Sequence, residues 1–272
     1  MITSFFPHNA VEYYVSYYDY YQPEAYIPQS DTYIEKDLAI NQEIDKLRLA
    51  ATSALLSGRN DVIVVSSVSC IYGMGNPSDF YNNVIDVDLG MKINRDALLL
   101  RLVASLYTRN DIELTRGTFR VRGDSVEINL AYADSAIRID FWGNEIERIE
   151  EFDPETGFTL NTYDSYKIYP ANLFMTTQQS QIDAVKKIQD DFVERVAYFQ
   201  EIGKPLEAKR LQERVEYDLE MIKELGHCSG IENYSRYFDG REPGSRPYCL
   251  LDFFPKDYLL VIDESHVSVP QI

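Results

Sequence analysis

Several features common in other proteins are missing from this sequence of 272 residues. It contains no apolar run of about eighteen residues and no cationic leader with an apolar core, so it predicts neither a membrane span nor an export signal. Its three cysteines form no Cys-x-x-Cys pair, which argues against structural zinc. We therefore expect a soluble protein of the reducing cytoplasm, and the 45% hydrophobic content is enough for sizeable cores.

Basic residues are also scarce. The 26 Lys and Arg residues stand against 44 Asp and Glu residues, which gives a net charge of −18. Because such a chain is repelled by a nucleic acid duplex, any DNA contact must be local or arranged by a partner. No Lys or Arg precedes Lys36, yet eight of the 21 tyrosines do. This segment is therefore rich in aromatic rings and has nothing with which to grip phosphates.

The tyrosine-rich segment, residues 13–36, predicts a β-hairpin with rings on both faces of its first strand. Alternation puts one set on one side, Tyr14, Tyr18 and Tyr20, and a second set opposite, Tyr13, Tyr17 and Tyr21. At least one face should then be exposed, where stacking on a base contributes about 1–3 kcal/mol regardless of sequence. A strand that packs in a sheet or at a protein interface explains the same pattern.

The periodicity of apolar residues predicts a parallel α/β sheet that other structure interrupts. A helix over residues 42–58 leads into a short buried strand at 61–66, and a second apolar strand follows at 258–262. Both strands are expected in one interrupted sheet, with a boundary at the Gly- and Pro-containing segment 73–77.

Between these strands the pattern changes twice. A compact α+β insert is predicted by a helix at 95–107 and alternating strands at 118–122, 125–130, 136–142 and 145–153. Hairpin turns are expected at Gly123 and Gly143. Residues 178–225 then predict two packed helices joined at residues 203–205.

The segment 259–266 has the form of a Walker B strand, in which a buried strand carries two acidic residues to its carboxyl end. In such a site Asp263 holds Mg²⁺ and Glu264 polarises the water that attacks the γ-phosphate. An apolar strand that ends in an ordinary polar turn fits the same residues. Because these residues contain no Gly-x-x-x-x-Gly-Lys-Ser/Thr sequence, we expect no ATP turnover by this chain alone.

Four arginines stand out against the acidic background: Arg109, Arg116, Arg120 and Arg122. Arg120 and Arg122 share one face of a predicted strand. A solvated charged face is the ordinary explanation of such residues. A docking patch for an acidic partner is the sharper hypothesis.

Six segments together resemble the UvrB family of bacterial nucleotide excision repair: residues 5–13, 17–26, 66–73, 116–124, 228–236 and 263–266. The resemblance runs in order through essentially the whole chain. His227 departs from it, since an aromatic residue is expected there in the family. The chain also begins past the family's P-loop and stops before its second motor domain, so we expect a fragment.

The resemblance implies roles for individual residues. The tyrosines that it assigns to DNA contact are Tyr17, Tyr18, Tyr20, Tyr21, Tyr26 and Tyr33. Glu24 and Lys36 match positions that lock the hairpin against the motor domain, and the four arginines match residues that dock on UvrA. Asp263 and Glu264 match the Walker B pair of a helicase-like motor, with ATP and Mg²⁺, the latter at Asp263, as cofactors of the complete protein. UvrA loads the protein on damaged DNA in this family, and UvrC then incises.

The resemblance also implies an α/β fold class: a partial helicase-like parallel sheet of the RecA-like, P-loop NTPase type, with an inserted α+β domain and a helical and hairpin subdomain. The expected motor part, 1a, comprises residues 1–12, 42–80 and 247–272. The hairpin and helical subdomain, 1b, comprises 13–41 and 171–246, and the UvrA-interaction domain comprises 81–170. Two other interpretations stay open, a UvrA-docking module without DNA activity and a fragment similar to a transcription-repair coupling factor.

Overall fold

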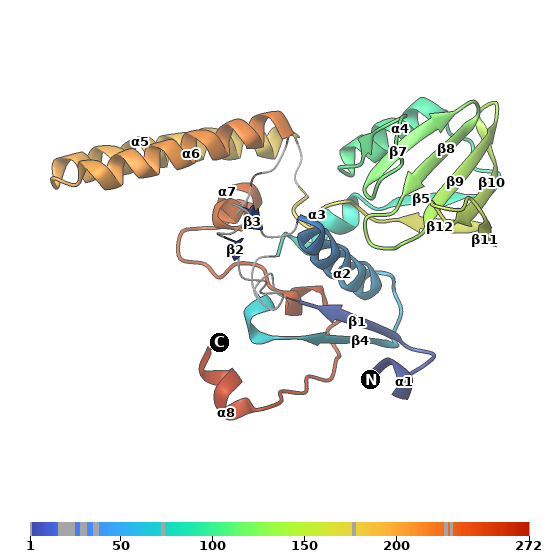
Figure 1. Ribbon diagram of the computed structural model, residues 1–272, viewed down its shortest axis with the longest axis horizontal. Helices are drawn as coiled ribbons and strands as arrows, with labels where there is room; N and C mark the ends of the chain where they lie inside the picture. The colour runs from blue at the N-terminus through green and yellow to red at the C-terminus, as the bar shows by residue number, and fades with distance from the viewer. Residues whose placement is uncertain are drawn as a thin grey trace. The chain divides into compact units, whose positions relative to one another are not determined.

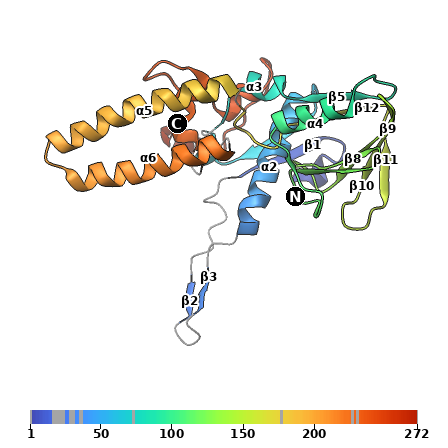
Figure 2. The same cartoon turned by 90° about the horizontal axis from the view of Figure 1, so that it is seen from above.

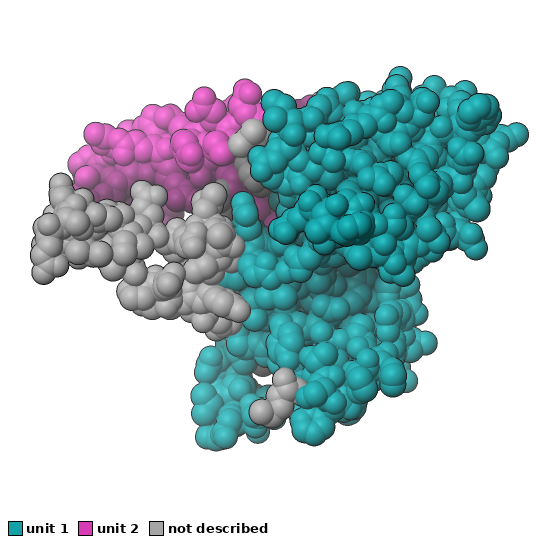
Figure 3. All heavy atoms as spheres, turned by 45° about the vertical axis from the view of Figure 1, so that its right-hand side comes forward, with its two compact units in different colours: residues 1–72, 80–173, 249–272 teal, residues 73–79, 174–248 magenta. Residues whose placement is uncertain are grey.

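The computed structural model describes residues 2–15, 25–27, 32–34, 38–71, 74–175, 178–225, 228 and 231–271. The chain is a mixed α/β protein (Figure 1) that divides into two compact units, coloured separately in Figure 3. The first unit comprises residues 1–72, 80–173 and 249–272, and the second comprises 73–79 and 174–248. Helix α3, Pro77–Asn82, spans the division in the sequence.

The first unit begins with a parallel pair of strands. Strand β1, Ala10–Tyr14, follows helix α1, Ile2–Phe5, and pairs with β4, Val62–Ser66. Helix α2, Leu38–Leu56, packs on β1, and the 3₁₀ turn η1, Val68–Cys70, follows β4. The predicted helix and the first predicted apolar strand are confirmed.

Helix α2 lies against β1 and contains buried apolar residues and one buried arginine. Ile44 and Ala51 of α2 are buried, as the helical spacing of the apolar residues requires. Tyr14 is fully buried at the end of β1, and the Arg48 guanidinium lies 5.1 Å from its ring centroid. Tyr14 is therefore a core residue of this unit.

The second predicted apolar strand, residues 258–262, is not a strand. Its five side chains are between 40% and 88% exposed, and within the described ranges no strand pairs with it. An extended segment becomes a strand only when a neighbour satisfies its backbone groups, and among the described residues the sheet that contains β4 has β1 as its only other strand. Short helical turns flank the segment: η3, Leu250–Phe253, α8, Ser265–Ser268, and η4, Val269–Gln271. The prediction that 61–66 and 258–262 share one sheet is wrong for the described residues.

Two short strands within the predicted tyrosine hairpin lie among the described residues. Strand β2, Ala25–Ile27, pairs antiparallel with β3, Thr32–Ile34, so that Tyr26 lies opposite Tyr33 in the register (Figure 2). Tyr13 and Tyr14 belong to the parallel strand β1, so the hairpin does not begin at residue 13. The remaining predicted hairpin residues lie outside the described residues: Tyr17, Tyr18, Tyr20, Tyr21, Glu24 and Lys36.

The insert in the first unit is built around a six-stranded sheet in the order β11-β10-β9-β8-β7-β6 (Figure 1). These strands are β6, Thr108–Arg109, β7, Thr118–Arg122, β8, Ser125–Asn129, β9, Ala136–Trp142, β10, Glu145–Phe152, and β11, Thr159–Thr162. A separate antiparallel pair is formed by β5, Ile85–Asp88, and β12, Ser165–Ile168. Helix α4, Arg95–Ala104, begins where the Asn94 side chain accepts a hydrogen bond from the Asp96 N–H.

Alternating side chains separate the two faces of this sheet. On one face Phe119, Ile128 and Ile139 form a core with residues of α4. The two-residue turns after β7 and β9 begin with glycines of positive φ, 61° at Gly123 and 63° at Gly143, as in type II′ turns. The predicted α+β insert and its hairpin turns are confirmed.

The second unit is a helical hairpin with a small helical cap. Helix α5, Gln178–Glu201, turns at Gly203, whose φ is 75°, into α6, Pro205–Leu225 (Figure 2). The cap is formed by η2, Ile231–Tyr234, and α7, Ser235–Asp239. A shared core includes Ile188 of α5 and Leu219 of α6, so the predicted helix pair is confirmed. Among the helices in the described ranges, none has both the length and the apolarity needed to cross a membrane.

Candidate protein-docking site

The face of the six-stranded sheet opposite its core carries charged residues on four neighbouring strands. Because side chains alternate along a strand, Arg120 and Arg122 of β7 point away from the core side that Phe119 faces. The register places further charged residues beside them: Glu127 of β8, Arg138 and Asp140 of β9, and Arg148 and Glu150 of β10. We call these seven residues the arginine face.

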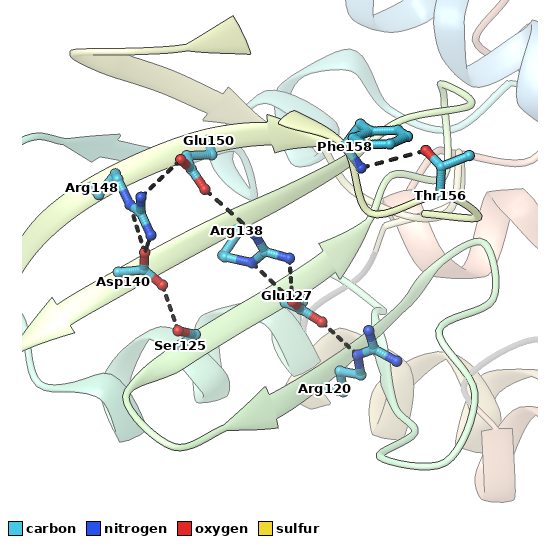
Figure 4. A network of polar contacts seen from close by, with 9 residues as sticks. All are labelled: Arg120, Ser125, Glu127, Arg138, Asp140, Arg148, Glu150, Thr156 and Phe158. Atoms are coloured by element: carbon cyan, nitrogen blue, oxygen red, sulfur yellow. Dashed lines mark hydrogen bonds and ion pairs between the residues drawn. The ribbon is translucent and has the colours of Figure 1, made fainter. Parts of the chain in front are cut away.

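Ion pairs connect the arginine face from β7 to β10 (Figure 4). Glu127 accepts a hydrogen bond from Arg120 Nε at 2.6 Å and pairs with Arg138 Nη2 at 2.8 Å. Arg138 continues to Glu150 at 3.4 Å. Arg148 then lies 3.1 Å from Glu150 and 2.7 Å from Asp140. Positive and negative charges therefore alternate across the sheet.

The carboxylates of this network lie deeper than the guanidinium groups. The exposed side-chain fractions are 6% for Glu127, 8% for Glu150 and 16% for Asp140, against 17% for Arg120, 24% for Arg138 and 55% for Arg148. Arg122 is exposed and has no ion pair among the described residues. The outward surface therefore presents guanidinium N–H groups, which suit carboxylate groups of a partner.

Two carboxyl groups of the sheet have perturbed ionisation. Burial acts to raise the pKa of Glu127, but the hydrogen bonds and charges of Arg120 and Arg138 outweigh it, so the pKa lies below its usual value. Burial also acts to raise the pKa of Glu151. Hydrogen bonds, one of them from the Tyr163 hydroxyl, outweigh this effect, so the pKa of Glu151 likewise lies below its usual value. Both groups are thus held in their ionised form.

We expect the insert to lose stability in acid. A carboxyl group whose folded pKa is lowered stabilises the fold above its unfolded pKa, near 4.5 for Glu127, and this contribution is lost as the pH falls through the lowered value. Glu127→Gln should therefore be less stable than the unaltered chain at neutral pH but less sensitive to acid. Thermal unfolding, followed by circular dichroism from neutral pH to below pH 4.5, measures both effects. An identical pH dependence of the two proteins would contradict the prediction.

The structure does not place the other two predicted docking arginines on the arginine face. Arg109 lies in the edge strand β6 and forms an ion pair at 3.0 Å with a residue two positions further along the chain. Arg116 forms ion pairs with Asp134 at 2.9 Å and with Glu43 of α2 at 3.4 Å. Lys46 of α2 also reaches Asp134, at 3.0 Å. Arg116 thus connects the insert to α2 within the first unit.

Sequence reasoning missed Arg138 and Arg148, which complete the arginine face. A signal for them was present, because Arg138 alternates with Asp140 and Arg148 with Glu150 in predicted strands, so each pair shares a face. Which strands lie beside β7 depends on the sheet order, and the sequence does not display that order.

Asp263 and Glu264 lie in an exposed turn before α8, not at the end of a strand. The Glu264 N–H donates to Asp263 Oδ1 at 2.9 Å, and His266 Nδ1 lies 3.4 Å from Glu264. In the part of the chain that the structure describes, no group of three or more His, Cys, Asp and Glu side chains is placed to hold a metal ion. The strand expected before these two residues is absent from the described chain, whereas their assignment as a Walker B pair stays a prediction.

Comparison with known proteins identifies the kind of domain that carries the arginine face. Residues 85–174 match the family model described as the UvrB interaction domain. Residues 179–240, which include most of the helical hairpin, match the model described as the UvrB third helical domain. Both units of the structure thus contain a domain that is specific to one family.

The relatives agree with these matches. The chain is 74% identical over 268 residues to UvrABC system protein B of Bacteroides fragilis and 72% identical over 268 residues to that of Bacteroides thetaiotaomicron, with 98% of the chain covered in both. It is 55% identical over 271 residues to UvrABC system protein B of Chlorobaculum tepidum. It spans 40% of the length of each of these relatives. The chain belongs to the UvrB family.

Proposed function

We propose that this chain acts in nucleotide excision repair as the damage-recognition part of a UvrB protein, which UvrA loads on damaged DNA before UvrC acts. The observation that carries this proposal is the arginine face, which lies within the residues that match the UvrB interaction domain. Its outward guanidinium groups suit an acidic surface, which we assign to UvrA. Loading by a partner also explains how a chain of net charge −18 reaches DNA.

The predicted arginines contribute to docking from different places. Arg120 and Arg122 contact UvrA from the arginine face. Arg109 and Arg116 are proposed as UvrA contacts outside that face. Arg116 contacts UvrA in this proposal while it is paired with Glu43 of α2.

The tyrosine hairpin is the proposed probe of the DNA. The antiparallel pairing of β2 with β3 supports a hairpin in this segment. The rings that stack on bases are those of Tyr17, Tyr18, Tyr20, Tyr21, Tyr26 and Tyr33, and stacking suits lesion detection because it does not depend on base sequence. Glu24 and Lys36 hold the hairpin against the motor part in this proposal.

The rest of the chain is assigned by the same proposal. Residues 1–12, 42–80 and 247–272 belong to a helicase-like motor part, which the parallel pair of β1 and β4 with α2 supports. Residues 13–41 and 171–246 form the hairpin and helical subdomain, and residues 81–170 form the UvrA-interaction domain. ATP and Mg²⁺ would bind only at a complete ATP site, in which further ligands are present beside Asp263 and Glu264.

The proposal predicts a UvrA-dependent contact between the hairpin and a lesion. A photoreactive phenylalanine analogue in place of Tyr20 should crosslink to a lesion-bearing oligonucleotide when UvrA is present and should not do so without it. The same analogue in place of Tyr217, which is 59% exposed on α6, is the control and should give no crosslink. Absence of a crosslink from the hairpin with UvrA bound would count against a DNA probe.

A UvrA-docking module without DNA activity is the second candidate, because the insert has a core and an ion-pair network of its own. It predicts that UvrA binding survives deletion of residues 16–36 and that the unaltered chain gives no DNA crosslink. The deletion begins at 16 because Tyr14 is buried in the core against α2. The relatives are UvrB proteins, which favours this family over a transcription-repair coupling factor.

A further inference from the structure

Trp142 is the only tryptophan of the chain, and it lies at the margin of the arginine face. It is the last residue of β9, directly before the turn glycine Gly143. Because Phe141 faces the core, the alternation in β9 points Trp142 to the same side as Arg138 and Asp140. Its indole ring is therefore part of the surface that we assign to docking.

The structure gives Trp142 no role inside the fold. Its side chain is 79% exposed, and within the described residues it makes no aromatic or cation–π contact. The core of the insert is closed by its neighbour Phe141, opposite Ile146 of β10. A tryptophan has about 150–250 Å² of surface to bury, and here most of that surface faces solvent.

The surroundings of Trp142 combine charges of both signs. The register places Arg148 opposite Asp140, two residues before Trp142 in β9. Glu145, the residue paired with Trp142, is exposed. A phosphate backbone carries charge of one sign and is repelled by such a carboxylate, whereas a protein surface can match both signs. These surroundings favour a protein partner over a nucleic acid.

We infer that Trp142 is the apolar anchor of the docking face and inserts into an apolar socket on the partner protein, with partner carboxylates beside the socket that meet the exposed arginines. Tryptophan and arginine are the residues most enriched among those that dominate binding at protein interfaces. An anchor at the margin of a charged network supplies the apolar burial that the network itself lacks. This inference rests on the proposed docking to UvrA and adds to it the residue that dominates affinity.

The single tryptophan makes the inference directly testable. Biosynthetic labelling of the chain with 5-fluorotryptophan gives one fluorine NMR resonance, which should shift or broaden when unlabelled UvrA is added. Trp142→Ala should weaken UvrA binding at least about tenfold, and Trp142→Phe should restore most of the affinity. The loss should persist at high salt because the contact is apolar, unlike the loss from an arginine substitution.

Phe158→Ala is the matched control. Phe158 is 73% exposed and lies in the turn that follows β10 (Figure 4). Trp142 is paired with Glu145 at the other end of β10. Its substitution should change UvrA affinity less than about twofold. Circular dichroism of each variant separates lost binding from lost folding, since neither side chain belongs to the core.

Two results would overturn the inference about Trp142. The proposed function would still stand in both cases, provided that the unaltered chain binds UvrA. One is a fluorine resonance that UvrA does not perturb, and the other is an equal loss of affinity in Trp142→Ala and Phe158→Ala. A resonance that an oligonucleotide perturbs and UvrA does not would overturn the assignment to a protein partner. If the unaltered chain does not bind UvrA at all, the proposed function itself fails.

Discussion

Glu127→Ala is expected to destabilise the inserted domain by about 3 kcal/mol. The Glu127 side chain is 6% exposed and is shared by Arg120 and Arg138, so its removal leaves two partly buried guanidinium groups without their common carboxylate. For a domain of this size the loss corresponds to a decrease in Tm of about 12–24 °C.

Thermal unfolding of the whole chain measures this loss, and hydrogen exchange in β7, β8 and β9 locates it in the insert. Glu147→Ala provides the control, because Glu147 is an exposed glutamate on β10 and its removal should change stability by less than about 0.5 kcal/mol. Equal decreases in Tm for the two variants would show that the network stabilises the sheet no more than a surface charge does.

Arg122→Glu is expected to weaken UvrA binding by about tenfold or more at low salt and to leave Tm unchanged. Arg122 is exposed and has no ion pair within the described chain, so its reversal acts on a partner and not on the fold. Arg120→Glu is also expected to weaken binding but is a poorer test. It puts a second carboxylate beside Glu127, which Arg120 Nε now contacts at 2.6 Å, and so lowers stability as well.

Titration of UvrA with each variant at two salt concentrations checks this expectation. The loss caused by Arg122→Glu should shrink as salt rises, because exposed charges are screened. Lys256→Glu makes the same change of charge at an exposed lysine outside the insert that has no ion pair among the described residues, and it should not alter affinity. Unchanged binding by Arg122→Glu would remove the arginine face from the docking proposal.

Much of the secondary structure could be predicted because local rules determine it. The predicted strands at 118–122 and 136–142 coincide with β7 and β9. A glycine of positive φ directly follows each strand, and an alternating pattern followed by glycine is typical of a strand that enters a hairpin turn. The two long helices were likewise visible from their apolar stripes and from the turn at Gly203.

Pairing between distant segments could not be predicted in the same way. Residues 258–262 have the composition of a buried strand, but composition does not say whether a neighbouring strand is present, and here their side chains are exposed. Tyr14 shows the converse, since its place among other tyrosines suggested an exposed hairpin and its contact with α2 and Arg48 buries it.

The same limit applies to the candidate site. Alternation alone predicted that Arg120 and Arg122 share a face, and the structure agrees. The partners of Arg116 are 73 and 18 residues away in the sequence, so no local pattern indicated that this arginine joins the insert to α2. Trp142 was also not singled out, because exposure depends on which face of the sheet the core occupies.

The carboxylates that lie beneath the arginines also affect the conformational entropy that the arginine side chains lose on docking. Arg138 and Arg148 each contact two carboxylates, so their long side chains are already confined before any partner arrives. Immobilising a flexible side chain on association costs about 0.5–1.5 kcal/mol, and the fold has removed most of that freedom in advance. The face therefore offers a partner a rigid pattern of hydrogen-bond donors, and recognition there depends on shape and charge, not on a search among rotamers.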